Sequence, residues 1–305
     1  MGHVEADLER ERRAHEEALR ASPDDLDVLA EAAEFYLGLG EEEDAPEWAH
    51  RALSIAERGS KVARRAGDAD DVAEFALLES AAASAAGRPR DALGRLERAL
   101  QSCAGHPALL VERGLLLFDL CRFGEARQQL VDALAADPDE PDAAAHHTLG
   151  LIAERAGDAR EAAARFAAAR ALAPDDFPCP IHVPGRAFET AVEDALAELP
   201  EPVRAYLSNV AIAVEDFPPD DDLLAADPPL PPTVLGMFRG APLGDKGSMD
   251  PWSHFPSSIV LYQRNLERFA TDRRDLVEQI RVTLLHEVGH FLGLDEEQLR
   301  ERGLD

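Results

Sequence analysis

The 305-residue sequence has few of the features that stabilise secreted or membrane-embedded proteins. It contains only three cysteines, Cys103, Cys121 and Cys179, and none of them forms a C-x-x-C pair. It also lacks an apolar run of the roughly 18 residues that a transmembrane helix needs. No apolar segment follows the charged start, MGHVEADLERERR. We therefore expect free thiols, no secretory signal and no membrane span, in a cytoplasmic protein.

Basic residues are also scarce. The chain has 31 Lys and Arg against 60 Asp and Glu, which gives a formal net charge of −29 at pH 7. Such a charge repels phosphate backbones and anionic lipids. We therefore expect no nucleic-acid partner and no membrane partner, whereas basic substrates or partners stay open.

The composition changes at a linker, DDFPCPIHVPG, that occupies residues 175–185. Before it, the chain is rich in Ala, Leu, Glu and Arg, with short Gly, Asp and Pro signals between helical stretches. After it come β-branched runs and proline-rich loops. A length of 305 residues suits about two domains. The predicted domains are residues 1–177 and residues 186–305, and the predicted fold class is α+β overall.

The first half contains an internal repeat with a spacing of 36 residues. Five positions recur at this spacing: Gly114, Ala126, Leu130, Ala133 and Pro138, then Gly150, Ala162, Phe166, Ala169 and Pro174. Looser copies precede them, at Gly87, Ala92, Leu96 and Ala99, and at Gly40, Ala45, Ala49 and Ala52. Small residues let two antiparallel helices approach closely, and we expect the larger Leu or Phe to fill the gap between neighbouring hairpins.

This small–large–small–proline pattern resembles the tetratricopeptide repeat. The resemblance is good over 106–175 and loose before it. It implies an all-α solenoid whose concave groove binds a protein or peptide partner.

The second half has the pattern of a small sheet and one long helix. Three runs have the composition of strands, and they are Val210–Val214, Thr233–Phe238 and Ser258–Tyr262. A helical pattern spans Phe188–Leu199, and the Gly- and Pro-rich interval 240–255 is expected to be a mobile loop. From Asp272, a good N-cap, a second helical pattern runs to Gly293, a typical helix-ending residue.

This last helix contains the motif H-E-x-x-H, formed by His286, Glu287 and His290. The two histidines are one helical turn apart, so both imidazoles can bind one zinc ion at about 2.0–2.1 Å. Glu287 is placed to accept a proton from the water that zinc activates, which predicts a general base for peptide hydrolysis. Tyr262 or Arg264, at the end of a strand, is a further candidate for stabilising the oxyanion or aligning the substrate.

A third ligand has to come from the 15 residues after His290. Gly293 allows the chain to turn back sharply, as in the extended pattern H-E-x-x-H-x-x-G-x-x-ligand. Counting ten residues from His286 predicts Glu296 as this ligand. Asp295 is the main alternative. Glu297 and Glu301 are less favoured.

Four segments together resemble the small bacterial metallopeptidases called minimal zincins. These segments are NVAIAVEDFP, VLGMFRGAPL, SIVLYQRNLERF and TLLHEVGHFLGLDEEQLRERGL, in that order. The resemblance covers about 120 residues and implies a short mixed sheet packed against an active-site helix. It also implies an acidic third ligand, most often aspartate, at the position of Glu296. No methionine follows Met249, so the methionine turn of metzincins is absent.

The sequence thus predicts a zinc-dependent metallopeptidase that acts on a peptide or protein, with a helical-repeat domain for binding a protein partner. The alternative is a repeat-based interaction or scaffold protein whose zincin domain holds a structural or weakly active zinc. Glu287 favours the enzyme, because a purely structural zinc site has no need of a carboxylate at that position.

Overall fold

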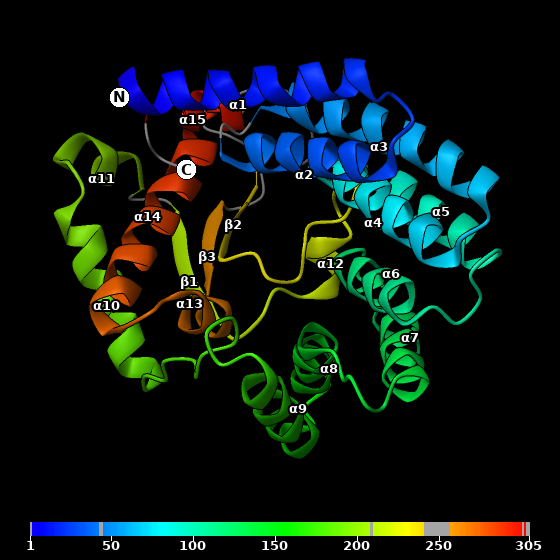
Figure 1. The fold of residues 1–305 in the computed structure, drawn as a ribbon. Coiled ribbons are helices and arrows are strands. Elements are labelled where there is room, and N and C mark those ends of the chain that lie inside the picture. The colour runs from blue at the N-terminus through cyan, green and yellow to red at the C-terminus, as the bar shows by residue number, and fades with distance from the viewer. Residues whose placement is uncertain (1, 43–44, 208–209, 241–256, 301, 303–305) are drawn as a thin grey trace. The chain divides into compact units, whose positions relative to one another are not determined.

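The computed structural model describes residues 2–42, 45–207, 210–240, 257–300 and 302. The chain divides into two compact units, which Figure 1 shows in blue to green and in green to red. The first unit comprises residues 1–177 with 227–229, and the second comprises residues 178–226 with 230–305.

The described part of the first unit is built from helices alone. In chain order they are α1 (Gly2–Ala21), α2 (Leu26–Glu42), α3 (Pro46–Ala66), α4 (Ala69–Ala85), α5 (Pro89–Leu100), α6 (Pro107–Asp119), α7 (Phe123–Ala136), α8 (Ala143–Arg155) and α9 (Ala159–Leu172). Consecutive helices pack as antiparallel hairpins, α2 with α3, α4 with α5, α6 with α7 and α8 with α9. This arrangement confirms the predicted all-α repeat region.

The repeated glycines make the hairpins tight. A Cβ atom added at Gly114 would lie 2.5 Å from Cδ2 of Leu130, and one added at Gly150 would lie 2.5 Å from Cε1 of Phe166. Each large side chain therefore covers the glycine of its own hairpin, on the partner helix. The expectation that Leu130 and Phe166 also fill the gap between neighbouring hairpins stays a prediction.

The glycine of the preceding copy has a different role. Gly87 lies in the turn after α4, with φ of 71°. The other three positions of this copy, Ala92, Leu96 and Ala99, precede their counterparts Ala126, Leu130 and Ala133 by 34 residues. The counterpart of Gly114 at that spacing is the buried Ser80. Serine is small enough to replace the glycine there. The earlier copy is therefore degenerate at the point of closest helix approach.

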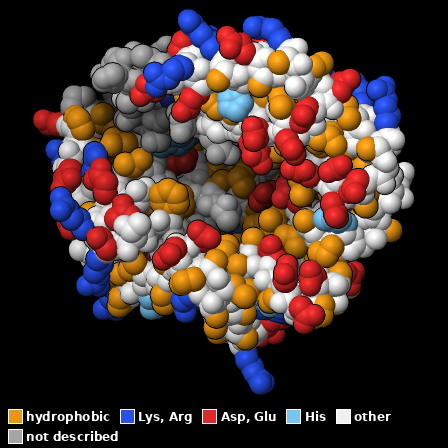
Figure 2. Space-filling view, in the orientation of Figure 1, with side chains coloured by type: hydrophobic (Ala, Val, Ile, Leu, Met, Phe, Trp, Pro, Cys, Tyr) orange, Lys and Arg blue, Asp and Glu red, His pale blue; other side chains and the backbone are white. Residues whose placement is uncertain are grey.

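Acidic side chains cover much of the first unit's surface. Figure 2 shows them gathered over the region of α2 to α6. The pKa of Glu74 is raised, first by burial and then by the neighbouring carboxylates of Asp71, Glu34 and Asp27. The negative charge is thus locally concentrated as well as large in total.

The second unit combines a small mixed sheet with helices. Its elements are α10 (Gly185–Glu198), α11 (Glu201–Leu207), β1 (Ala211–Glu215), α12 (Asp220–Leu223), β2 (Gly236–Arg239), β3 (Ser258–Tyr262), α13 (Gln263–Phe269), α14 (Arg273–Leu292) and α15 (Glu296–Arg300). The strand order is β1-β3-β2. β3 pairs parallel with β1 and antiparallel with β2, so the sheet is mixed, as the sequence predicted.

One face of the sheet packs against α14. Ile259 and Leu261 of β3 are fully buried in a core that also contains Ile280 and Leu284 of α14. The alternation of side chains along a strand places Val260 and Tyr262 on the opposite face, and both are fully buried as well. Burial on both faces explains why Ser258–Tyr262 reads as an unbroken apolar run.

The long helix α14 has the ends that the sequence predicted. Asp272 caps it by accepting hydrogen bonds from the backbone N–H groups of Arg274 (2.7 Å) and Asp275 (2.9 Å). Gly293 ends it with a left-handed φ of 88°, a conformation that side chains other than glycine resist. The chain can therefore turn back directly after the H-E-x-x-H motif.

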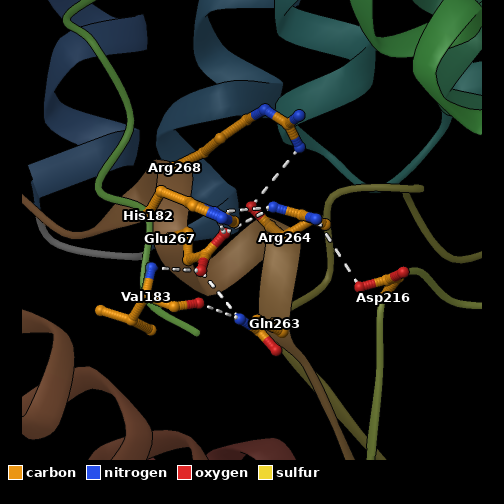
Figure 3. A network of polar contacts seen from close by, with 7 residues as sticks. All are labelled: His182, Val183, Asp216, Gln263, Arg264, Glu267 and Arg268. Carbon is orange, nitrogen blue, oxygen red and sulfur yellow. Dashed lines mark hydrogen bonds and ion pairs between the residues drawn. The ribbon is translucent and has the colours of Figure 1, made fainter. Parts of the chain in front are cut away.

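From Pro178 on, the linker before α10 belongs to the second unit. Figure 3 shows the carboxylate of Glu267, on α13, among donors from three residues. It accepts hydrogen bonds from the N–H of Val183 (3.0 Å), from Nε2 of Gln263 (2.8 Å) and from Nη1 of Arg264 (3.1 Å). Val183 itself is buried in the same core as α14.

None of the helices among the described residues is long and apolar enough to cross a membrane. The predicted mobile loop at 240–255 lies, apart from Gly240, outside the described residues. The proline-rich segment after β1 contains the short helix α12, and its Leu223 is fully buried.

Candidate metal centre

The two histidines of the motif converge at the C-terminal half of α14. Nε2 of His286 lies 3.0 Å from Nε2 of His290, and both side chains border the same cleft. Two ligands of one tetrahedral zinc, each at about 2.0–2.1 Å, are separated by about 3.3 Å. The described pair therefore has nearly the spacing that a shared metal ion requires.

The ring orientation of His290 is held by the backbone. Its Nδ1 lies 3.2 Å from the carbonyl oxygen of Leu294. A carbonyl can only accept, so Nδ1 carries the proton and Nε2 keeps its lone pair. This is the hydrogen bond that usually accompanies a metal-binding histidine.

The side chain of Glu287 extends from α14 toward the edge strand β2. This side chain is buried and lines the same cleft as the two histidines. Across from it stands Gly236. A Cβ atom added at Gly236 would lie 2.6 Å from Cγ2 of Thr283 and 3.3 Å from Cγ of Glu287. The absence of a side chain at Gly236 thus gives Glu287 its room next to the sheet.

The cleft itself has a volume of about 500 Å³. One wall is the C-terminal half of α14 with the turn after it, and the other is β2 with the segment that precedes it. The histidines and Glu287 stand on the first wall. The second wall is largely apolar and includes Leu230, Val234 and Met237.

Asp295, the alternative third ligand, has another role in the structure. Its Oδ1 accepts a hydrogen bond from the N–H of Gln298 (2.9 Å), while Oε1 of Gln298 accepts one from the N–H of Asp295 (3.2 Å). This reciprocal pair is a capping box at the start of α15. Asp295 lines the cleft, but one of its oxygens is used to cap the helix.

The third ligand is not assigned by the described side chains. Among them, no group of three or more His, Cys, Asp or Glu residues is arranged to hold a metal ion. Glu296 is the first residue of α15, directly after the capping residue, but its side chain lies outside the described set, as do those of Glu297 and Glu301. Glu296 therefore stays a prediction.

Neither candidate for oxyanion stabilisation is among the described residues that line the cleft. Tyr262 is fully buried on the face of the sheet that points away from α14. Arg264 belongs to the network around Glu267, and its Nε lies 3.6 Å from Oδ1 of Asp216. Both residues contribute to the framework of the second unit.

Sequence reasoning missed the residues of the opposite wall. Gly236, Leu230 and Val234 carry no metal-binding or titratable group, so no motif marks them. The available signal was the unusual glycine at the start of a strand, which often indicates close approach of another element.

Comparisons with known proteins match two separate parts of the chain. The family model of zincin-like metallopeptidases matches residues 207–304, and that of the tetratricopeptide repeat matches residues 83–149. The search of curated proteins gave no match.

Several solved structures are similar to this chain. A thermophilic TPR protein from Thermus thermophilus has 23% sequence identity and a TM-score of 0.43, covering 57% of this chain and 87% of its own. MamA (41-end) from Desulfovibrio magneticus RS-1 has 19% identity and a TM-score of 0.41, covering 54% of this chain and 85% of its own.

Both family matches fall where the sequence had suggested a resemblance. The helical repeat and the short mixed sheet behind the motif-bearing helix agree with them. The chain therefore contains tetratricopeptide repeats at 83–149 and a zincin-like metallopeptidase domain at 207–304.

Proposed function

We propose that the second unit is a zinc-dependent peptidase. The observation that supports this most directly is the convergence of His286 Nε2 and His290 Nε2, 3.0 Å apart, in a cleft that Glu287 also lines. Two histidines and a glutamate are costly to place together at a partly buried site unless a metal ion compensates. Glu296 is the proposed third ligand.

When bound, zinc supplies Lewis acidity toward a water molecule and toward the scissile carbonyl. The carboxylate of Glu287 takes a proton from the water molecule as the oxygen of that water attacks the carbonyl carbon. The same carboxylate then gives the proton to the amide nitrogen as the C–N bond breaks. The products are a carboxylic acid and an amine, so one water is consumed for each bond cleaved.

The edge of β2 suits an extended peptide. The N–H of Tyr262 donates to the carbonyl of Leu235 (2.9 Å). In an antiparallel pair the hydrogen-bonded positions alternate, so Met237 also pairs with β3, whereas the N–H and C=O groups of Gly236 and Phe238 point outward. A substrate can pair with these groups as an added strand beside Glu287.

The helical repeats are proposed to bind a protein or peptide partner, as tetratricopeptide repeats generally do. The acidic surface disfavours nucleic acid and anionic membranes, and both exclusions remain predictions. The three cysteines form no disulfide, and the cytoplasmic location stays a prediction.

One substitution distinguishes the proposed enzyme from the scaffold alternative. In the full-length protein, Glu287→Gln is expected to retain zinc but to lose peptide hydrolysis by about 10²–10⁴-fold, because the ligands survive and the base does not. The matched control is Glu278→Gln, an exposed glutamate on the same helix and outside the cleft.

The measurements are metal content by elemental analysis and cleavage of a peptide library with and without chelator. Undiminished cleavage by Glu287→Gln would overturn the assigned base. A zinc-loaded wild type that cleaves nothing, while still binding a partner through its repeats, would favour the scaffold alternative.

A further inference from the structure

The wall of the cleft opposite the metal motif is formed by a fixed segment. Leu230 and Val234 both line the cleft and precede β2. The N–H of Leu230 donates to the carbonyl of Leu223 (3.0 Å), and the N–H of Val234 donates to the carbonyl of Pro231 (3.2 Å). The two apolar side chains are therefore presented from a hydrogen-bonded turn.

A buried amide holds this turn against the rest of the unit. Asn265, on α13, is buried, and its Nδ2 donates to the carbonyl of Pro232 (3.0 Å) and to that of Val234 (2.7 Å). Two carbonyls of one short segment are thus fixed by a single side chain. A wall held in this way is preorganised and loses little entropy when it receives a ligand.

The described lining of the cleft is unsuited to an acidic side chain. Its charged groups are the carboxylates of Glu287 and Asp295, and no Lys or Arg is among its described residues. Arg239, the last residue of β2, is held by Glu215 (2.8 and 3.0 Å) and by Asp222 (2.7 Å). A substrate carboxylate placed against Leu230 and Val234 would therefore lose water without gaining a described Lys or Arg partner, which is costly.

The direction of β2 indicates which side of the scissile bond lies against Leu230 and Val234. Gly236 lies opposite Glu287, and Phe238 packs against Phe291 with ring centroids 5.8 Å apart. β2 thus starts at the Glu287 end, next to Val234. A peptide that pairs antiparallel with β2 runs the opposite way, so its carboxyl-terminal side reaches Leu230 and Val234.

We propose that Leu230 and Val234 form a subsite that selects an apolar side chain on the carboxyl side of the scissile bond and disfavours an acidic one. This proposal rests on the proposed function of the cleft. Asn265 is its positioning residue, because it acts through the backbone of Pro232 and Val234.

The test uses the full-length, zinc-loaded protein and one peptide series that varies only at the residue after the scissile bond. Leu and Phe are expected to exceed Glu in kcat/KM by about tenfold or more, the range that an apolar pocket provides. Val234→Asp should remove this preference and favour Lys. The control is Val277→Asp, an exposed valine on α14 outside the cleft, which should leave the preference unchanged.

Binding is measured separately, by fluorescence anisotropy of the same peptides on the Glu287→Gln variant. The subsite is supported by tighter binding of the Leu peptide than of the Glu peptide, provided that the double variant Glu287→Gln/Val234→Asp loses this difference. This result would support the subsite even if the wild type cleaved no peptide. A lack of cleavage by the wild type would reject only the peptidase activity. Leu230→Ser gives a second variant where Val234→Asp does not fold. Cleavage or binding without an apolar preference, or a preference unchanged by both wall variants, overturns the subsite, as does the absence of both cleavage and binding.

Discussion

Gly289, within the H-E-x-x-H motif, is in contact with Leu299 of α15. A Cβ atom added at Gly289 would lie 2.1 Å from Cδ2 of Leu299, and Leu299 is fully buried. The helix that carries the two histidines thus has a flat surface on which the following short helix packs. This packing fixes the start of α15, where the predicted third ligand is located.

Gly289→Ala is therefore expected to lower the free energy of unfolding by about 1–3 kcal/mol, as overpacking of a buried contact does. It should also weaken zinc binding, because α15 has to move. The measurements are thermal unfolding and titration with a competing chelator.

Gly94→Ala provides the control for this substitution. Gly94 lies within α5, and a Cβ atom added there would meet nothing within 4 Å. Alanine at such a position is expected to stabilise the helix by about 0.5–1 kcal/mol. A Gly289→Ala protein as stable as the wild type, with unchanged zinc affinity, would show that α15 does not depend on this contact.

Zinc affinity should distinguish Glu296 from Asp295. Glu296→Ala is expected to weaken zinc binding at least about tenfold, because it removes a proposed ligand. Asp295→Ala should leave the affinity nearly intact but lower the stability of α15 by about 1 kcal/mol, because Asp295 caps that helix through the N–H of Gln298. The reverse ranking in a chelator competition would transfer the ligand role to Asp295. An affinity unchanged in both variants would place the third ligand elsewhere.

Local patterns in the sequence predicted most of the second unit. β3 has the predicted bounds, and α14 has the predicted cap and end, because burial periodicity and capping are local signals. β2 begins at Gly236, three residues later than expected. The reason is tertiary: Asn265 binds the carbonyls of Pro232 and Val234 and holds them in a turn.

The contacts of the linker could not be predicted, for a similar reason. Val183 lies outside any helix or strand, as a linker residue should, yet its N–H bonds to Glu267, which is 84 residues away in the chain. Nothing near Val183 in the sequence indicates this partner. Pairings across such distances depend on the finished fold, so they are beyond the reach of local motifs.

The Glu267 network leads to a prediction about where the second unit begins. A fragment of residues 178–305 retains the bond from the N–H of Ile181 to the carbonyl of Glu267 (3.0 Å) and that from Val183 to its carboxylate. A fragment of residues 186–305, the boundary predicted from sequence, loses both bonds and the buried Val183. We expect the shorter fragment to be less stable by about 2–4 kcal/mol.

Urea unfolding of the two fragments measures this difference. Glu267→Gln in the longer fragment provides an internal check, because it keeps an acceptor oxygen but removes the charge that Arg264 pairs with. It should cost less than the truncation does. Equal stability of the two fragments would mean that the linker contributes nothing to the fold.

Tyr262 should make the second unit sensitive to alkali. Burial raises the pKa of its phenol from 10 to about 12, Asp222 and Glu215 act in the same direction, and Arg239 opposes them. The folded state therefore holds the proton more tightly than the unfolded state. The stability contribution is fully present below pH 10 and is lost as the pH rises through about 12, by about 2–3 kcal/mol in total.

Tyr262→Phe removes the ionisable group, so its stability relative to the wild type should rise between these two pH values. Tyr36→Phe, in the first unit, controls for the other tyrosine with a raised pKa. Urea unfolding at a series of pH values, followed together with the ultraviolet absorbance of tyrosinate, measures both effects. A constant stability difference between Tyr262→Phe and the wild type across this range would show that Tyr262 ionises normally and would contradict its burial.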